Sequence, residues 1–289
     1  MHKKFRCMLF IVLFAGLSFV VSSLIVTYLL IGSSTSKVTW PISADYSPEN
    51  VTFPASDGLN LKGWFLPQID STKAIVLLHG VRANREQVLS RALWLHSLGY
   101  NVLLYDARGC GESTPALHSF GHYEIRDLIG ALNWLQDRGM PRIGCLGCSQ
   151  GAATILLASG QLPPSVHAVV AEASYATLQN TIDDHFRAYT ALPGSFFGML
   201  VVPFSEVKLG LKVAEVSPLH EISKLQAPLF ILGGTSDKMA PPAGTYELYE
   251  AATCDKSLWM IEGARHVDLL SYTEAEYKRR VGNFLQKHL

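Results

Sequence analysis

The sequence predicts an α/β protein with a doubly wound, mostly parallel sheet, and two observations support this class. Short runs of apolar residues recur along the chain, such as AIVLL at 74–78 and NVLLY at 101–105. Segments whose apolar residues repeat with helical spacing lie between these runs. Strands that are apolar throughout are typical of parallel sheets, because helices cover both faces of such a sheet. No internal repeat is visible, so the alternation predicts one domain over residues 51–289.

The expected strands are rich in β-branched and other apolar residues. An initial antiparallel pair is expected at 51–53 and 61–65, followed by strands at 74–78, 101–105, 143–146, 166–171, 229–232 and 258–261. Helices are expected at 85–98, 123–138, 149–159, 242–252 and 273–289. Residues 174–216 break this order, because they contain no candidate buried strand and include the apolar stretch 196–204. An insertion of that length is usually a lid or a binding element.

The amino terminus carries a long apolar segment. Residues 8–32 contain no charge, and as a helix rising ~1.5 Å per residue they would reach ~37 Å, enough to cross a ~30 Å hydrocarbon core. Lys3, Lys4 and Arg6 precede the segment, as they would in a secretory signal peptide, but the apolar core of a signal peptide is usually only ~7–15 residues long. A retained signal anchor is therefore favoured over a cleaved signal peptide. The excess of basic residues before the segment predicts a cytoplasmic amino terminus and an extracytoplasmic body, either periplasmic or outside the cell.

These features divide the chain into three parts. Residues 1–32 form the predicted cytoplasmic tip and transmembrane anchor, residues 33–50 a linker, and residues 51–289 the globular domain with a lid at about 174–216. The chain has 24 Lys and Arg against 24 Asp and Glu, and all charges in its first 37 residues are basic. The body is therefore mildly acidic, which argues against a nucleic-acid partner. The sequence does not determine the oligomeric state.

A candidate nucleophile follows the strand at 143–146. Gly147-Cys148-Ser149-Gln150-Gly151 lies between this strand and an expected helix. Glycines at these positions permit the sharp strand-to-helix turn that lifts a serine hydroxyl above a sheet. The GxSxG pattern is weak evidence by itself and becomes strong in this context, so Ser149 is the predicted nucleophile.

A serine hydroxyl needs a general base, and the chain offers ten histidines. His266 follows the last expected strand and precedes the last expected helix, which is the position of the base in such a site. His79 also follows a strand. Because it directly precedes Gly80, we expect it to support the backbone of that turn instead.

The base needs a carboxylate that orients its ring. Asp237 follows the strand at 229–232 and lies between nucleophile and histidine in chain order, so it is the predicted acid. Glu172, at the end of the preceding strand, is the rival. Asp268 lies only two residues from His266 and is expected to begin a helix.

Acyl attack also requires backbone N–H donors for the oxyanion. Gln150, the residue after the nucleophile, is expected to supply one, and Val81, in the loop after the strand at 74–78, the other. No metal or organic cofactor is required. Cys145 and Cys148 have the spacing of a redox or metal pair, but no second such pair or nearby histidine completes a site, so packing thiols are expected.

Five motifs together resemble the α/β-hydrolase superfamily, and more narrowly its prolyl-oligopeptidase-like and related membrane-anchored serine hydrolases. They are LHG at 78–80, YDARGCGES at 105–113, GCSQG at 147–151, GGTSD at 233–237 and GARHVD at 263–268. The resemblance covers the chain from residue 51 to its end. It implies the fold of that superfamily and a Ser-Asp-His triad, and structural roles for Asp106 and Arg108 in a strand-end turn.

Three functions are compatible with these residues. The favoured one is a serine hydrolase that cleaves small-molecule carboxylic esters or thioesters through an acyl-enzyme intermediate. An amidase or small-peptide hydrolase would use the same triad, and a catalytically silent, membrane-tethered binding protein would use none of it. The stretch 196–204, with Phe196 and Phe197, is predicted either to form an apolar lid over the acyl pocket, resting on the membrane, or to pack as an ordinary inserted helix.

Overall fold

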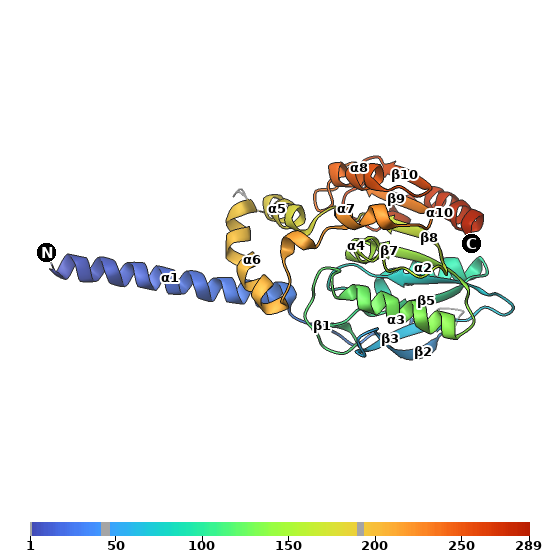
Figure 1. Ribbon diagram of the computed structural model, residues 1–289, viewed down its shortest axis with the longest axis horizontal. Coiled ribbons are helices and arrows are strands. Elements are labelled where there is room, and N and C mark those ends of the chain that lie inside the picture. The colour runs from blue at the N-terminus through green and yellow to red at the C-terminus, as the bar shows by residue number, and fades with distance from the viewer. Residues whose placement is uncertain (1, 42–46, 190–193) are drawn as a thin grey trace.

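A twisted sheet of eight strands forms the centre of the described protein (Figure 1). The computed structural model describes the backbone of residues 2–41, 47–189 and 194–289, and the side chains of these residues apart from 2–4, 185–189, 194–197 and 200. The sheet has the order β10-β9-β8-β7-β4-β5-β3-β2. Its strands are β2 (Glu49–Pro54), β3 (Asn60–Leu66), β4 (Lys73–Leu78), β5 (Asn101–Tyr105), β7 (Arg142–Cys148), β8 (Val166–Glu172), β9 (Leu229–Gly234) and β10 (Lys256–Ile261).

The prediction of a mostly parallel sheet is confirmed. Strand β3 pairs antiparallel with β2 and with β5, and the strands from β5 to β10 are parallel to one another. Each predicted strand is present, with bounds that differ by a few residues at most. The predicted initial antiparallel pair is β2 and β3.

Helices cover both faces of the sheet, as continuous apolar strands require. Alternate residues of β4 belong to opposite cores: Val76 packs with α3 (Glu124–Asp137), α4 (Gln150–Leu157) and α8 (Pro242–Ala251), whereas Leu77 packs with α2 (Leu89–Ser97) and α10 (Glu274–His288). A 3₁₀ turn, η1 (Arg85–Val88), begins the helix predicted at 85–98. The remaining short elements are β6 (Cys110–Gly111), η2 (Val213–Glu215), α7 (Pro218–Glu221), η3 (Ile222–Lys224) and α9 (Leu269–Tyr272).

The insertion between β8 and β9 is helical. It contains α5 (Leu178–Tyr189) and α6 (Gly194–Leu209), which pack against each other on the side of the body nearest the amino-terminal helix (Figure 1). The side chains of Phe196 and Phe197 lie outside the described residues. A lid role for the insertion stays a prediction.

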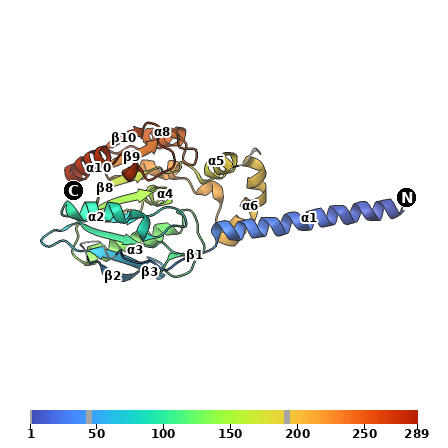
Figure 2. The same ribbon diagram turned by 180° about the vertical axis from the view of Figure 1, so that it is seen from behind.

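A single long helix, α1 (His2–Ile31), extends away from the body (Figure 2). Residues Phe5–Ile31 are long and apolar enough to cross a membrane, and little of this stretch is buried. The helix is therefore a candidate for either a membrane anchor or a signal sequence. Its last residue, Ile31, is nonetheless buried in a core cluster with Leu209 and Leu211.

The predicted linker at 33–50 is partly structured. Strand β1 (Ser34–Thr35) pairs in parallel with β6, and the N–H groups of Ser34 and Ser36 donate to the carbonyls of Gly109 and Gly111 over 2.7 and 2.8 Å. Strand β2 then begins at Glu49 rather than at residue 51. A strand of two residues is too short to produce a hydrophobic pattern in the sequence. The sequence therefore predicted only a linker in this region.

Candidate active site

Ser149 lies at a strained turn between β7 and α4. Its φ is +53°, in the left-handed region that non-glycine residues rarely adopt, and its N–H donates to the Glu172 carbonyl over 2.7 Å. The flanking glycines make the turn possible. A Cβ on Gly147 would lie 2.4 Å from the Gly151 carbonyl carbon, and one on Gly151 would lie 2.4 Å from the Leu78 oxygen. The sequence therefore folds locally into a turn that presents the Ser149 hydroxyl at the carboxyl edge of the sheet.

His266 and Asp237 lie in line with this hydroxyl. The Nε2 atom of His266 is 3.1 Å from Ser149 Oγ, and its Nδ1 is 2.8 Å from Asp237 Oδ2. Asp237 is buried at the end of β9, and its other oxygen accepts from the N–H groups of Met239 and Ala240 over 2.8 and 2.9 Å. The structure thus brings together the three residues that the sequence selected, with the carboxylate held by its own loop.

Glu172, the rival acid, is bound elsewhere. Its carboxylate accepts from Arg91 Nε and Nη2 over 3.0 and 2.7 Å and from the Tyr277 hydroxyl. Arg91 also lies 2.6 Å from Asp268 Oδ1, and Asp268 caps α9 by accepting from the Leu270 N–H. The predicted capping role of Asp268 is confirmed, and Glu172 forms part of a buried ion-pair cluster that links β8 to the loop of His266.

The loop that carries Val81 is held beside Ser149. The Nε2 atom of His79 accepts from the Ala107 N–H over 3.0 Å, so its Nδ1 carries the proton and donates to the Gly80 carbonyl over 2.7 Å. Burial lowers the pKa of His79, which keeps it in this neutral form. A Cβ on Gly80 would lie 3.5 Å from Ser149 Cβ, so the loop is next to the nucleophile. His79 supports the turn, as predicted.

Gln150 begins α4 directly after Ser149. The first N–H groups of a helix have no partner within that helix and can bind an anion. The Gln150 N–H therefore lies at a position where it can donate to an oxygen above Ser149. The Gly80 N–H is already used, because it donates to Gln87 Oε1 over 2.6 Å, which leaves Val81 as the next backbone donor in the loop.

Comparison with known proteins identifies the family of the fold. Residues 73–216 match the family described as the α/β hydrolase fold. Protein YqkD of Bacillus subtilis is 31% identical over an alignment of 240 residues, which covers 80% of this chain and 77% of YqkD. The chain belongs to the α/β-hydrolase family. Protein YfhR of Escherichia coli strain K12 is a further relative, 28% identical over an alignment of 251 residues, which covers 83% of this chain and 81% of YfhR.

A solved structure refines the assignment. The Pyrococcus furiosus esterase Pf2001 superposes with a TM-score of 0.74 at 26% identity, covering 89% of this chain and 99% of the esterase. The chain is thus an esterase-like α/β hydrolase, and the prediction that it is an enzyme is confirmed at this level.

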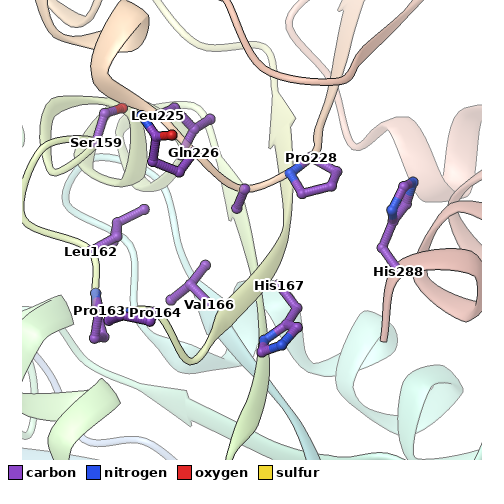
Figure 3. A pocket seen from close by; sticks show the side chains of 11 residues that line it. Ser159, Leu162, Pro163, Pro164, Val166, His167, Leu225, Gln226, Pro228 and His288 are labelled. Atoms are coloured by element: carbon purple, nitrogen blue, oxygen red, sulfur yellow. The ribbon is translucent and has the colours of Figure 1, made fainter.

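The hydrolase has a cavity of about 200 Å³ beside Ser149. Gln87, Arg91, Cys148 and Val267 are among its lining residues, so it combines a buried cation with apolar atoms. No described residue of α5 or α6 lines it. Another cavity, of about 510 Å³, lies at the amino ends of β8 and β9, and His167 and His288 are among its lining residues (Figure 3). That cavity is at the edge of the sheet opposite to Ser149, so it is not part of the candidate site.

Sequence reasoning missed the cluster around Arg91 and the support from Gln87. Both side chains lie in or beside a helical stripe, where a polar residue resembles any other surface position. The fold buries Arg91 and brings the amide oxygen of the exposed Gln87 to the Gly80 N–H. The structural roles implied for Asp106 and Arg108 hold. Asp106 accepts from the N–H groups of Arg85 and Glu112, each over 2.8 Å, and Arg108 Nε donates to Asp127 over 2.9 Å.

Cys145 is buried in the hydrolase, and Cys148 is half-buried beside the cavity next to Ser149. Cys145 and Cys148 are free thiols, and burial raises the pKa of both. The Cys148 thiol donates to Glu172 Oε2 over 3.6 Å. A raised pKa disfavours the reactive thiolate. These contacts support the packing role that the sequence predicted.

Proposed function

We propose that this α/β hydrolase cleaves carboxylic esters or thioesters through an acyl-enzyme intermediate. Ser149 is the nucleophile, His266 the general base and Asp237 the residue that orients its ring. The observation that carries the proposal is the continuous hydrogen-bond chain from Asp237 through His266 to the Ser149 hydroxyl. The similarity to esterase Pf2001 favours an ester substrate.

The reaction follows from this chain of contacts. Ser149 Oγ attacks the carbonyl carbon while His266 Nε2 takes its proton, and Asp237 stabilises the imidazolium that forms. The N–H groups of Val81 and Gln150 bind the oxyanion of the tetrahedral intermediate. His266 then gives the proton to the leaving alcohol or thiol, and the acyl group stays on Ser149. Water attacks this acyl-enzyme by the same steps and releases the acid.

We also propose that α1 is retained as a membrane anchor, with a cytoplasmic amino terminus. Support comes from the packing at its end: Ile31 is buried in the body, and Arg82 Nη1 donates to the Gly32 carbonyl over 2.8 Å. Cleavage after Ile31 would remove a side chain that belongs to the core. A chain with an amino-terminal epitope tag should therefore keep the tag and stay in the membrane after alkaline carbonate extraction. Loss of the tag into a processed, soluble body would contradict the anchor.

Substrate class is tested by rates on matched probes with the full chain in detergent. We expect hydrolysis of p-nitrophenyl acetate and butyrate, and much slower hydrolysis of aminoacyl p-nitroanilides. The Ser149→Ala variant should lose about 10⁶-fold in kcat, whereas Ser97→Ala, at an exposed serine of α2, should be unchanged. Faster turnover of the anilides would favour the amidase alternative. Equal background rates for wild type and Ser149→Ala would favour a silent binding protein.

A further inference from the structure

The helix α6 presents an apolar stripe to solvent. Met199 is 66% exposed and Val207 is 86% exposed, and Pro203 lies between them. These residues are spaced by four positions, so they share one face of the helix. Residues of the opposite face, Val201 and Ser205, are buried. We call Met199, Pro203 and Val207 the α6 stripe. It is an apolar surface that the body does not cover.

The packing of α6 on α1 determines where the α6 stripe lies relative to a membrane that α1 crosses. Helix α6 packs against the last turns of α1, where Ser23 and Thr27 are buried. It runs across α1 rather than along it (Figures 1 and 2). A helix crosswise to a membrane-spanning helix lies parallel to the membrane plane. The contact with the final turns of α1 places α6 where the span leaves the hydrocarbon core.

Apolar surface continues from α1 onto this region. Leu24 and Tyr28 of α1 are 49% and 72% exposed near the contact with α6. Tyrosine is enriched at membrane–water interfaces, because its ring is apolar and its hydroxyl is polar. Tyr28 therefore marks the headgroup level at the height of α6. The continuity of exposed apolar residues from a candidate span onto α6 fits a lipid surface better than a soluble protein partner.

The candidate active site faces the same side. Arg82 directly follows Val81, and its guanidinium donates to the Gly32 carbonyl at the end of α1. The exposed apolar residues Val81 and Val267 lie on the two loops that flank Ser149, with exposed fractions of 40% and 46%. The edge of the sheet that carries Ser149 is thus tied to the end of α1.

We propose that α6 lies in the headgroup region of the bilayer that α1 crosses, with the α6 stripe in contact with lipid. It thereby holds the Ser149 edge of the domain against the membrane surface. The occupant of this surface is lipid, and the proposal rests on the anchor role of α1 proposed above. Helices that lie in the interface bury their apolar face ~5–10 Å into the boundary of headgroups and acyl chains.

Environment-sensitive probes at three matched positions test the proposal. Single cysteines are introduced by Val207→Cys, Leu17→Cys and Ile69→Cys in a full-length background carrying Cys7→Ser and Cys254→Ser, and are labelled with the fluorophore NBD. Leu17 is 63% exposed in the middle of α1, and Ile69 is 87% exposed in the loop before β4. Ile69 matches Val207 in apolar character and exposure but lies at the opposite edge of the sheet. The unsubstituted background gives the level of labelling at the remaining thiols.

The labelled proteins are reconstituted in phosphatidylcholine vesicles with and without lipids that carry a shallow or a deep doxyl quencher. We expect the Val207 probe to be quenched at least twofold by the shallow quencher, the Leu17 probe by the deep one, and the Ile69 probe by neither. A Val207 probe as unquenched as that at Ile69, with Leu17 quenched, would overturn the α6 proposal and leave the anchor intact. Absence of quenching at both Leu17 and Val207 would overturn both. Hydrolysis of p-nitrophenyl acetate by the same samples reports on the catalytic proposal separately.

Discussion

At the scale of single residues, two buried carboxylates compete for the role of orienting acid, and their surroundings separate them. Asp237 lies 2.8 Å from His266, whereas Glu172 pairs with Arg91 and Tyr277. One carboxylate therefore contacts the ring of His266, and the other holds the buried guanidinium of Arg91. The sequence could offer both, because each follows a parallel strand, but it could not show which one reaches the histidine.

We expect Asp237→Asn to lower kcat by about 10⁴-fold with little change in melting temperature, because the amide no longer favours the required tautomer of His266. Glu172→Gln should instead lower the free energy of unfolding by about 1–3 kcal/mol, since Arg91 loses its buried carboxylate partner and keeps only the more exposed Asp268. Steady-state kinetics and thermal melting of both variants check this pair. The assignment is wrong if Glu172→Gln stays fully stable and loses activity while Asp237→Asn stays active.

The Val81 prediction concerns a backbone donor, so the side chain itself should matter little. Val81→Ala keeps the N–H and should retain most of the kcat for p-nitrophenyl acetate. Val81→Pro removes the donor and should lower kcat by about 100- to 1000-fold. Circular dichroism of the proline variant checks that the fold is intact. Equal kcat for a folded Val81→Pro variant and wild type would remove Val81 from the oxyanion site.

At the scale of elements, the turn from β7 into α4 depends on close backbone approach. A Cβ on Gly151 would lie 2.4 and 2.7 Å from the carbonyl oxygens of Leu78 and His79, which the sheet holds in place. We expect Gly151→Ala to lower the free energy of unfolding by about 1–3 kcal/mol or more and to displace Ser149 from His266.

Gly282→Ala is the matched control for this change. A Cβ on Gly282, within α10, would meet only Trp94 at an ordinary 3.6 Å, so the substitution should leave stability unchanged or raise it by about 0.5–1 kcal/mol. Urea unfolding of both variants gives the comparison. Equal stability of Gly151→Ala and wild type would mean that the turn is looser than the structure indicates.

Some structural elements could be predicted from the sequence, and others could not. Strand positions and the GxSxG turn were predictable, because hydrophobic runs and glycine spacing are local signals. The pairing of β1 with β6 and the ion pairs of Arg91 were not predictable, because they depend on contacts between segments far apart in the chain. For the same reason the sequence identified an apolar insertion at 174–216 but could not place α6 across α1.

At the scale of the whole molecule, buried neutral histidines connect stability to pH. His118 is fully buried next to Ser34 and Cys110, and burial lowers its pKa to about 4. Burial lowers the pKa of His79 as well. An unfolded histidine titrates near 6.5, so the unfolded chain binds more protons than the folded chain between about pH 6.5 and pH 4. The stability that depends on neutral His118 is present above pH 6.5 and is lost as the pH falls through this window.

We therefore expect the melting temperature to fall between pH 7.5 and pH 4.5, and to fall less in His118→Gln. The exposed His220 provides the control, since His220→Gln should keep the full pH dependence of wild type. Differential scanning calorimetry across this range measures the effect. An identical pH dependence in His118→Gln and wild type would show that His118 does not contribute.

The domain brings Ser149, His266 and Asp237 together at one edge of the sheet, and we propose that they form a nucleophilic site. The most direct measurement is covalent labelling of the full chain in detergent with a fluorophosphonate, followed by peptide mapping. We expect one adduct, on Ser149, formed at least 100-fold more slowly in His266→Ala. An unlabelled but folded wild-type protein, or an adduct on a different serine, would contradict this proposal.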